Sequence, residues 1–345
     1  MLEVLRKPVR GSSVWTSAEI EADGGWTHRY SDRELAEIAA ALDALRSRGL
    51  KVGAFGRDEF PLPTLSATIA AKVQEVEAGR GFALLSGLPV EDYDLDELRL
   101  IYWGIGSYFG NPISQNSKGQ ILADVVDLGN DYSNNNTRGY KTSAALSAHV
   151  DSCDMVALLC VRTARAGGES TLVSSMSIFN EILAHFPQFL PILFRGFKHD
   201  LRGEGVTARL DEMTFHEIPV FSYFGGQLSC NFNAKIIRSA RRKLGQPLTE
   251  LEEAAIECVL ELSRRQDLCY RMDLRPGDIQ LVNNYTVLHG RSAYSDYPDD
   301  ARKRRLMRFW VNSRAGRNLA PEFTDRYNTG PGQGVAVGDG ARYMF

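Results

Sequence analysis

Two residues near the middle of the chain have the types and the spacing of a metal site. His149 and Asp151 stand on either side of Val150, directly ahead of an apolar run at 155–161. If this segment is extended, the two side chains lie on the same face, where an imidazole nitrogen and a carboxylate oxygen can bind one metal ion. A lone His-x-Asp triplet is weak support, because such triplets often arise by chance. A metal site therefore needs a third ligand elsewhere in the sequence.

A third candidate ligand, His289, comes much later in the chain. Pro276 and Gly277 predict a turn, residues 279–282 predict a strand, and His289 falls in a second extended stretch. The chain then offers two histidines and one carboxylate, the facial triad that leaves positions open on Fe(II). Two open positions can take a chelating keto acid, and a third can take dioxygen. The candidate chemistry is thus oxidation at a non-heme iron.

Two arginines that follow His289 could hold the far carboxylate of such a keto acid. In a strand, Arg304 and Arg308 share one face, and Arg305 takes the other. A guanidinium group suits a carboxylate because its planar fork makes two parallel hydrogen bonds. The alternative is a solvated basic run at 302–305, but the sequence continues into Phe-Trp-Val, which is typical of a core. We therefore expect Arg304 and Arg308 to point inward.

In this order, the motifs resemble those of the taurine catabolism dioxygenase (TauD/TfdA) family, which are iron(II)- and 2-oxoglutarate-dependent oxygenases and include clavaminate-synthase-like enzymes. The resemblance runs from about residue 81 to residue 311. It implies a double-stranded β-helix, or jelly roll, and the cofactors Fe(II), 2-oxoglutarate and O2. The segments that carry it are 81–89, 104–115, 149–151, 167–175, 275–278, 284–289 and 304–308.

The resemblance also implies roles for single residues. His149, Asp151 and His289 match the family's iron ligands, and Arg304 matches the arginine that binds the C5 carboxylate of 2-oxoglutarate. The family's hydroxyl partner for that carboxylate lies in a Thr-Leu-x-Ser-Ser type of sequence, so the resemblance implies Thr171 in this chain.

Three further positions qualify this match. The sequence has an extra residue after Gly167 and Gly168, so Ser170 is the alternative to Thr171. Arg308 matches a second arginine that lies near the substrate or the cosubstrate in the family. Taurine-specific members have a substrate-binding asparagine four residues ahead of the metal histidine, where this chain has Ala145. Taurine is therefore not the expected substrate.

The elements that must position these residues divide into a helical and a β-rich part. A first helix is expected to begin at the capping box of Ser31 and Glu34, and two more helices are expected at 64–78 and 95–109. About residues 1–120 are therefore expected to be mainly helical, with one buried strand at 82–87. Short β-like runs then follow at 121–126, 155–161, 171–174, 220–224, 228–232, 268–272 and 279–282.

This series predicts a mainly β fold with surrounding helices (α+β), built on a sandwich or barrel. Helices interrupt it at 177–194 and 249–265, and Gly225-Gly226 predicts a tight hairpin turn. We expect a single domain over residues 1–345, with a core at about 121–315 and an irregular tail at about 316–345. The long polar segment 129–146 is expected to be a lid, mobile until substrate binds.

Composition excludes several classes of partner. The 345 residues carry a net charge of −3, without the basic excess typical of nucleic-acid binding. No apolar run approaches membrane-spanning length and the N-terminus lacks a signal-peptide core, so we expect a soluble, cytoplasmic protein that acts on a small molecule. The five cysteines are expected to be reduced thiols. The oligomeric state stays open, with a homodimer as one alternative.

The favoured function is oxidation of an unactivated C–H bond of a small polar metabolite, an amino acid or a related carboxylate being the leading candidates. Hydroxylation is the default outcome, and desaturation or cyclisation would use the same ligands. A halogenase is disfavoured because Asp151 occupies the position that halide would need. A zinc hydrolase and a non-catalytic metal-binding β-sandwich are the alternatives from other classes. Of the other histidines, His216 could lie at a pocket rim, and the rest are expected at the surface or as caps, namely His28, His185 and His199.

Overall fold

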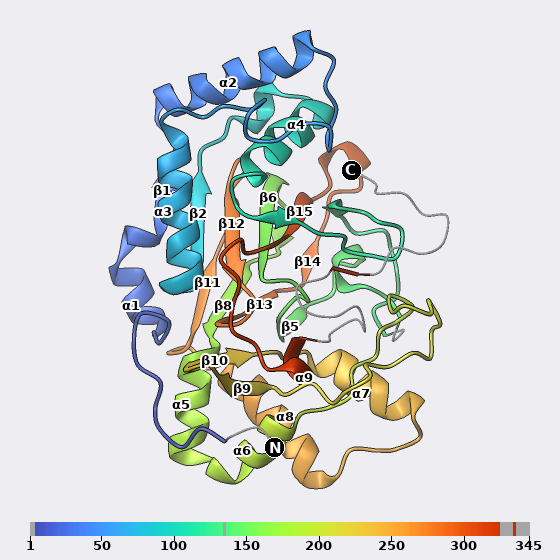
Figure 1. Cartoon of the computed structure of the whole chain (residues 1–345). Coiled ribbons are helices and arrows are strands. Elements are labelled where there is room, and N and C mark those ends of the chain that lie inside the picture. The colour runs from blue at the N-terminus through green and yellow to red at the C-terminus, as the bar shows by residue number, and fades with distance from the viewer. Residues whose placement is uncertain (1–3, 134–135, 325–333, 336–345) are drawn as a thin grey trace.

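A larger and a smaller β-sheet lie at the centre of the molecule, with helices around them (Figure 1). The structure is a computed structural model that describes residues 4–133, 136–324 and 334–335. In these residues the larger sheet has seven strands in the order β1-β2-β12-β6-β15-β3, and β4 also pairs with β15. These strands are β1 (Thr27–Arg29), β2 (Phe82–Ser86), β3 (Asn111–Pro112), β4 (Leu122–Val125), β6 (Met155–Arg162), β12 (Ile279–Asn283) and β15 (Arg305–Asn312).

The smaller sheet has the order β11-β8-β13-β5. Its strands are β5 (Leu146–His149), β8 (Ser170–Ser174), β11 (Cys269–Met272) and β13 (Val287–Arg291), and two short ladders join β7 (Ala166–Gly167) to β14 (Tyr294–Ser295) and β9 (Phe221–Phe224) to β10 (Gln227–Cys230). The α-helices are α1 (Ser17–Ala22), α2 (Asp32–Ser47), α3 (Leu65–Ala78), α4 (Leu95–Gly106), α5 (Ser175–His185), α6 (Leu190–Arg195), α7 (Ala234–Lys243), α8 (Glu250–Leu262) and α9 (Pro321–Thr324).

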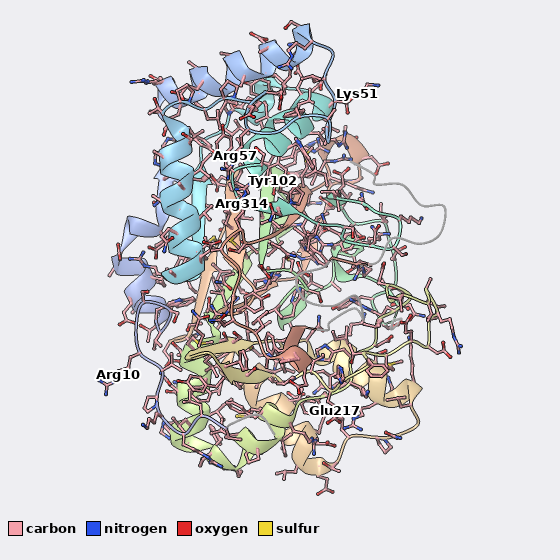
Figure 2. All side chains as sticks on the ribbon, in the orientation of Figure 1. Arg10, Lys51, Arg57, Tyr102, Glu217 and Arg314 are labelled. Atoms are coloured by element: carbon pink, nitrogen blue, oxygen red, sulfur yellow. The ribbon has the colours of Figure 1, made fainter. Side chains whose placement is uncertain are left out.

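One face of the larger sheet packs on the N-terminal helices. Phe309 of β15 and Leu281 of β12 belong to the same buried cluster as Ile38 of α2 and Tyr102 of α4. Tyr102, labelled in Figure 2, is fully buried, and its ring centroid lies 6.0 Å from that of Phe309. Gly106 completes this contact, because a Cβ there would lie 2.4 Å from the Phe309 ring. The predicted N-terminal helices therefore cover the outside of this sheet.

The opposite face of the larger sheet looks toward the smaller one. Val156, Val282 and Trp310 lie in a buried cluster with Leu172 and Val287 of the smaller sheet. Since side chains alternate along a strand, the residues of β15 that share a face with Trp310 also point between the sheets. This alternation fixes the direction of the arginines in β15.

The outer face of the smaller sheet packs on the second helical group. Val173 and Leu288 join Phe179 of α5 and Val259 of α8 in one buried cluster. Figure 1 shows α5, α6, α7 and α8 gathered at the end of the molecule opposite α2 and α4. The two sheets are thus covered from outside by different helices, which leaves the space between them for the candidate site.

Local sequence signals explain several of these elements. Ser31 and Glu34 form the predicted capping box of α2, and Thr249 forms the equivalent box at α8. The predicted hairpin is confirmed, because Phe224 pairs with Gln227 around two glycines with φ of 57° and 80°. Glycine accepts positive φ without the steric cost of a Cβ.

Other expectations need correction. The helix predicted at 177–194 is broken into α5 and α6, because Pro187 follows the end of α5 and cannot continue the backbone hydrogen bonding of the helix. The helix predicted to reach residue 109 ends at Gly106. Helix α7 lies in a stretch for which no helix was predicted, because its surface is dominated by charged residues. The β core was expected at 121–315, but strands β1, β2 and β3, which precede residue 121 in the sequence, also belong to the larger sheet. Most of the tail predicted at 316–345 lies outside the described residues.

Candidate active site

The two candidate metal-binding histidines lie side by side because their strands pair. His149 ends β5, His289 lies in β13, and the two residues are direct partners in this antiparallel pair, with ring centroids 4.5 Å apart. Asp151 follows two residues later, and the ligand atoms of the three side chains lie within 4.8 Å of one another. In the part of the chain that the structure describes, this is the one group of three or more His, Cys or carboxylate side chains close enough to hold a metal ion.

Burial favours the neutral form of both imidazoles. Nδ1 of His149 lies 2.9 Å from the carbonyl oxygen of Ser147, so Nδ1 donates its proton and Nε2 keeps a lone pair. Burial lowers the pKa of His149, although Asp151 opposes this effect. Burial also lowers the pKa of His289 to about 3, and His149 adds to the shift. At neutral pH each ring therefore offers a metal its lone pair.

Asp151 is held in place as an anion. Its backbone N–H donates to Oδ1 of Asn284 at 2.9 Å, and its Oδ2 accepts from Nε1 of Trp310 at 3.0 Å. Burial alone would raise the pKa of Asp151, but Arg308 and the two histidines outweigh burial and hold this pKa at about 2. A charged carboxylate and two neutral imidazoles fit a divalent metal such as Fe(II).

A first cavity of about 550 Å³ opens beside these three residues. Apolar side chains of the larger sheet form one wall, among them Val156, Leu158 and Leu306. Its polar residues, besides the three candidate ligands, are Tyr140, Ser170, Arg291, Arg304 and Arg308.

The strand phase predicted for the arginines is confirmed. Arg304 and Arg308 are buried and line the first cavity together with Leu306. Arg305 points away from it, because its Nη1 lies 2.9 Å from Oδ2 of Asp124. Nη1 of Arg304 is buried without a hydrogen-bond partner, as expected of a group that awaits an anion.

Arg308 is fixed next to the candidate metal site. Its Nε donates to Oε1 of Gln115 at 2.6 Å, and its guanidinium carbon lies 4.5 Å from the ring centroid of Tyr140 and 4.9 Å from that of Trp310. Its Nη1 lies 3.7 Å from Oδ2 of Asp151. Arg308 therefore adjoins the metal site and lines both of its cavities.

The structure reverses the order of the two hydroxyl candidates. Ser170 lines the first cavity and lies opposite Arg291 in the β8–β13 pair. Thr171 lies on the other face of β8, where its Oγ1 would be 2.7 Å from a Cβ on Gly290. The lining of the first cavity therefore favours Ser170, the alternative that the spacing from Gly167 and Gly168 left open, over Thr171.

Arg291 and Tyr294 were missed in the sequence. Arg291 donates from Nη2 to the carbonyl oxygen of Thr142 at 2.9 Å, whereas its Nη1 is buried without a partner. Burial lowers the pKa of Arg291 to about 10, and the like charge of Arg304 adds to the shift. The ring of Tyr294 lies 4.6 Å from the guanidinium carbon of Arg291 and 5.0 Å from that of Arg304. The available signal was spacing, because Arg291 follows His289 by two residues in a strand.

A second cavity, of about 780 Å³, shares His149, Asp151 and Arg308 with the first. Its other walls come from the predicted lid, from Arg202, from the start of α7, from Leu260 of α8 and from Arg264, which follows the end of α8. Tyr132, Arg138 and Tyr140 are the lid residues with the largest side chains in this lining. Ala145 is exposed and lines neither cavity.

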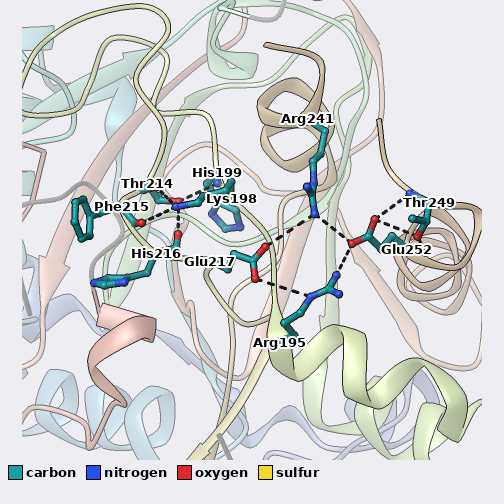
Figure 3. A network of polar contacts seen from close by, with 10 residues as sticks. All are labelled: Arg195, Lys198, His199, Thr214, Phe215, His216, Glu217, Arg241, Thr249 and Glu252. Carbon is teal, nitrogen blue, oxygen red and sulfur yellow. Dashed lines mark hydrogen bonds and ion pairs between the residues drawn. The ribbon is translucent and has the colours of Figure 1, made fainter. Parts of the chain in front are cut away.

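Ion pairs anchor α7 beside the second cavity. Figure 3 shows Arg195 of α6 and Arg241 of α7 on either side of Glu252 and Glu217. The Nη2 of Arg241 lies 3.2 Å from Oε1 of Glu252, which also caps α8. The charged residues that hid α7 in the sequence are therefore those that hold it in position.

The remaining histidines do not line either cavity. His28 lies 3.0 Å from Oε2 of Glu34, and His185 is exposed near the end of α5. The pocket-rim role of His216 is not supported, since this exposed ring packs on Phe215 (Figure 3). The surface position predicted for His199 is wrong, because His199 is 3% exposed.

The sequence also matches a known family over most of its length. Residues 46–310 match the model of the "Taurine catabolism dioxygenase TauD, TfdA family", and the chain belongs to this family. It is therefore a non-heme iron(II) dioxygenase that uses 2-oxoglutarate and O2, with the jelly-roll fold of the clavaminate-synthase-like enzymes.

Individual relatives support this membership. The chain is 35% identical over 323 residues to FR-33289 synthase of Streptomyces rubellomurinus, covering 92% of this chain and 94% of the relative. It is 26% identical over 306 residues to a taurine hydroxylase-like protein of Stachybotrys chartarum, covering 86% and 77%.

Solved structures share the fold at low sequence identity. An asparagine oxygenase in complex with Fe(II), 2S,3S-3-hydroxyasparagine and succinate has a TM-score of 0.65 at 15% identity, covering 84% of this chain and 94% of that one. The oxygenase OrfP with Fe and alpha-ketoglutaric acid has a TM-score of 0.60 at 16% identity, covering 83% and 93%. Of the helices in the described residues, none has the length and apolar character needed to span a membrane.

Proposed function

We propose that the chain hydroxylates an unactivated C–H bond of a small polar metabolite at an iron centre held by His149, Asp151 and His289. Iron(II), when bound with 2-oxoglutarate and O2, supplies the oxidation and releases succinate and CO2. The observation that carries this proposal is the position of the triad. Two of its members, His149 and Asp151, line both cavities, as does the neighbouring Arg308. One cavity can then hold the cosubstrate while the other holds the substrate.

The first cavity supplies what a 2-oxoglutarate site requires. Arg304 would bind the C5 carboxylate through its bidentate fork, and Ser170 would donate a hydroxyl hydrogen bond to it. Arg291 adds a second buried cation within the same lining. The apolar wall limits water around these charges, which strengthens their attraction for a carboxylate.

Outer contacts hold the ligands in orientation. Trp310 and Asn284 fix Asp151, and the Ser147 carbonyl fixes the tautomer of His149. Such partners usually matter nearly as much as the ligands themselves, and their loss typically costs about 10- to 100-fold in metal affinity or activity.

The zinc hydrolase alternative is not favoured. A hydrolase built on two histidines and a carboxylate needs one activated water and no keto acid. It would leave the buried guanidinium groups of Arg291 and Arg304 without a function. An amino acid or a related carboxylate remains the proposed substrate range, and the asparagine oxygenase neighbour is consistent with it.

Succinate formation tests this function directly. Purified protein with Fe(II), 2-oxoglutarate and O2 should form succinate, and His289→Ala should reduce the rate by at least about 100-fold, since a ligand matters more than an outer partner. The matched control is His216→Ala, which removes an exposed histidine that lines neither cavity. Full activity in His289→Ala, or zinc-dependent hydrolysis without succinate, would contradict the proposal.

A further inference from the structure

We propose that Gln280 is a positioning residue for the cosubstrate, because its side-chain amide directs the hydroxyl of Ser170 toward the far carboxylate of 2-oxoglutarate. Ser170 lines the first cavity, whereas Gln280 lies behind it and is not among the lining residues. Gln280 therefore acts through Ser170 and not by touching the ligand. The inference rests on the proposed function, since it takes the first cavity as the 2-oxoglutarate site.

Gln280 is a polar side chain buried between the two sheets. It lies in β12 and is 1% exposed. Its neighbours Ile279 and Leu281 belong to the cluster that packs on the N-terminal helices, so alternation directs Gln280 and Val282 to the other face, toward the smaller sheet. An amide buried among apolar side chains costs free energy unless hydrogen bonds satisfy it. The contacts of Gln280 in this layer therefore matter.

Two residues of the smaller sheet contact this amide. Its Nε2 lies 3.0 Å from Oγ of Ser170 in β8 and 3.1 Å from Sδ of Met272 in β11. Its Oε1 lies 3.2 Å from the same Oγ. Ser170 and Met272 are direct partners in the β8–β11 pair. Gln280 thus reaches from the larger sheet to one residue pair of the smaller sheet.

The sulfur of Met272 determines which end of the amide faces it. A thioether sulfur is a weak hydrogen-bond acceptor and has no proton to donate. The nitrogen and oxygen of a side-chain amide are assigned from such neighbours. The atom beside Sδ must therefore be Nε2, since a carbonyl oxygen there would meet the lone pairs of the sulfur. Met272 in this way fixes the orientation of the Gln280 amide.

This orientation leaves the hydroxyl proton of Ser170 available for the cosubstrate. Nε2 of Gln280 donates to Oγ, so the hydroxyl proton can go to a different acceptor. Oε1 of Gln280 accepts this proton at 3.2 Å when no ligand is near. A carboxylate is the stronger acceptor, because charge-assisted hydrogen bonds are about twice as strong as neutral ones. The proton would then turn to the ligand, and the bond from Nε2 would strengthen its donation.

A purely structural role for Gln280 makes a different prediction. A bridge that only holds the two sheets together would act on every ligand of the first cavity alike. A residue that orients the Ser170 hydroxyl would act on ligands that have a far carboxylate, and would have no effect once that hydroxyl is removed. The two roles can therefore be separated by the choice of keto acid and by a double variant.

Titration of keto acids into the Fe(II)-loaded enzyme without O2 tests the inference. Gln280→Met removes the amide and keeps an unbranched side chain, and it should weaken 2-oxoglutarate binding by about 3- to 5-fold, the effect of one neutral hydrogen bond. In the Ser170→Ala background the same substitution should change the affinity by less than about twofold. The matched control is Gln227→Met, which replaces an exposed glutamine of β10 that lines neither of the two cavities.

A second ligand and a second variant extend the test. Binding of 2-oxopentanoate, which has the same carbon chain without the far carboxylate, should stay unchanged in Gln280→Met. Met272→Leu leaves Gln280 in place and removes the sulfur acceptor, and it should weaken 2-oxoglutarate binding by about twofold without affecting 2-oxopentanoate. With saturating 2-oxoglutarate, succinate formation in Gln280→Met should match the unsubstituted enzyme, because the effect lies in KM and not in kcat.

The contrary outcomes are distinct. Equal losses for the two keto acids, or losses that multiply in the double variant, would make Gln280 a structural bridge and overturn the inference. Unchanged 2-oxoglutarate binding in both Gln280→Met and Met272→Leu would also overturn it, and the proposed function would stand if the unsubstituted enzyme forms succinate. An unsubstituted enzyme that neither binds 2-oxoglutarate nor forms succinate would refute the proposed function itself.

Discussion

Adjacent residues in this chain differ sharply because strand alternation sends them to opposite faces. Arg304 has an unpartnered Nη1 beside the first cavity, whereas its neighbour Arg305 pairs with Asp124 outside. Ser170 and Thr171 divide in the same way. Single substitutions at these neighbours therefore make the sharpest tests of the cosubstrate site.

Arg304→Ala should weaken 2-oxoglutarate binding by about two to three orders of magnitude. A buried bidentate pair contributes about 3 to 5 kcal/mol, and each decade of affinity corresponds to about 1.4 kcal/mol. Arg305→Ala should change binding by less than about fivefold, because it removes a partly exposed ion pair on the outer face. Titration of 2-oxoglutarate into both variants without O2 measures this difference. A stronger effect from Arg305→Ala would contradict the assigned faces.

Ser170→Ala should weaken 2-oxoglutarate binding by about 5- to 10-fold, the value of one hydrogen bond of about 1 kcal/mol. Thr171→Val should have little effect, because its hydroxyl faces Gly290 away from the cavity. The same titration compares the two variants. If Thr171→Val lost more affinity than Ser170→Ala, the choice of Ser170 would be wrong.

At the scale of elements, the segment 129–146 joins the two cavities. Tyr140 lines both, and Lys235 and Arg138 tie the segment to α7 and to the backbone of Gln115. Both of these ties reach backbone carbonyls from long side chains. Among the described residues of the segment, 129–133 and 136–146, regular structure is limited to the short 3-10 turn at Gly139–Lys141 and the first residue of β5. Such a segment belongs to the least stable part of a fold.

We predict that amides in this segment exchange quickly in the metal-free protein and more slowly once Fe(II), 2-oxoglutarate and the substrate are bound. The physical reason is that a ligand in the second cavity adds contacts to Tyr132 and Tyr140. Hydrogen exchange with mass spectrometry measures this, with α2 as the internal reference. Strong protection before any ligand is added would argue against a lid.

At the scale of the whole molecule, the sequence predicts the centre better than the periphery. The faces of the arginines follow from the period of two in strands. The candidate metal ligands are His149 at the end of β5, Asp151 two residues later, and His289, which strand pairing brings opposite His149. The element bounds shift where a local breaker such as Pro187 acts. The two-sheet architecture came from the family resemblance together with the number of short strands.

The parts that sequence reasoning missed depend on contacts between distant segments. Arg202, Lys235 and Arg264 line one cavity from a loop, from α7 and from the turn that follows α8. No motif joins them, because their positions are set by ion pairs such as Arg241 with Glu252 and by the buried Asp200. The lining of the second cavity therefore depends on packing between distant segments, which a single sequence does not display.

The most direct test of the account is a crystal structure with Fe(II) and 2-oxoglutarate bound in the absence of O2, using anomalous scattering at the iron edge. The account predicts one iron peak among His149, Asp151 and His289, with the cosubstrate's C5 carboxylate on Arg304 and Ser170. An iron peak away from these three side chains, or 2-oxoglutarate bound outside the first cavity, would contradict it.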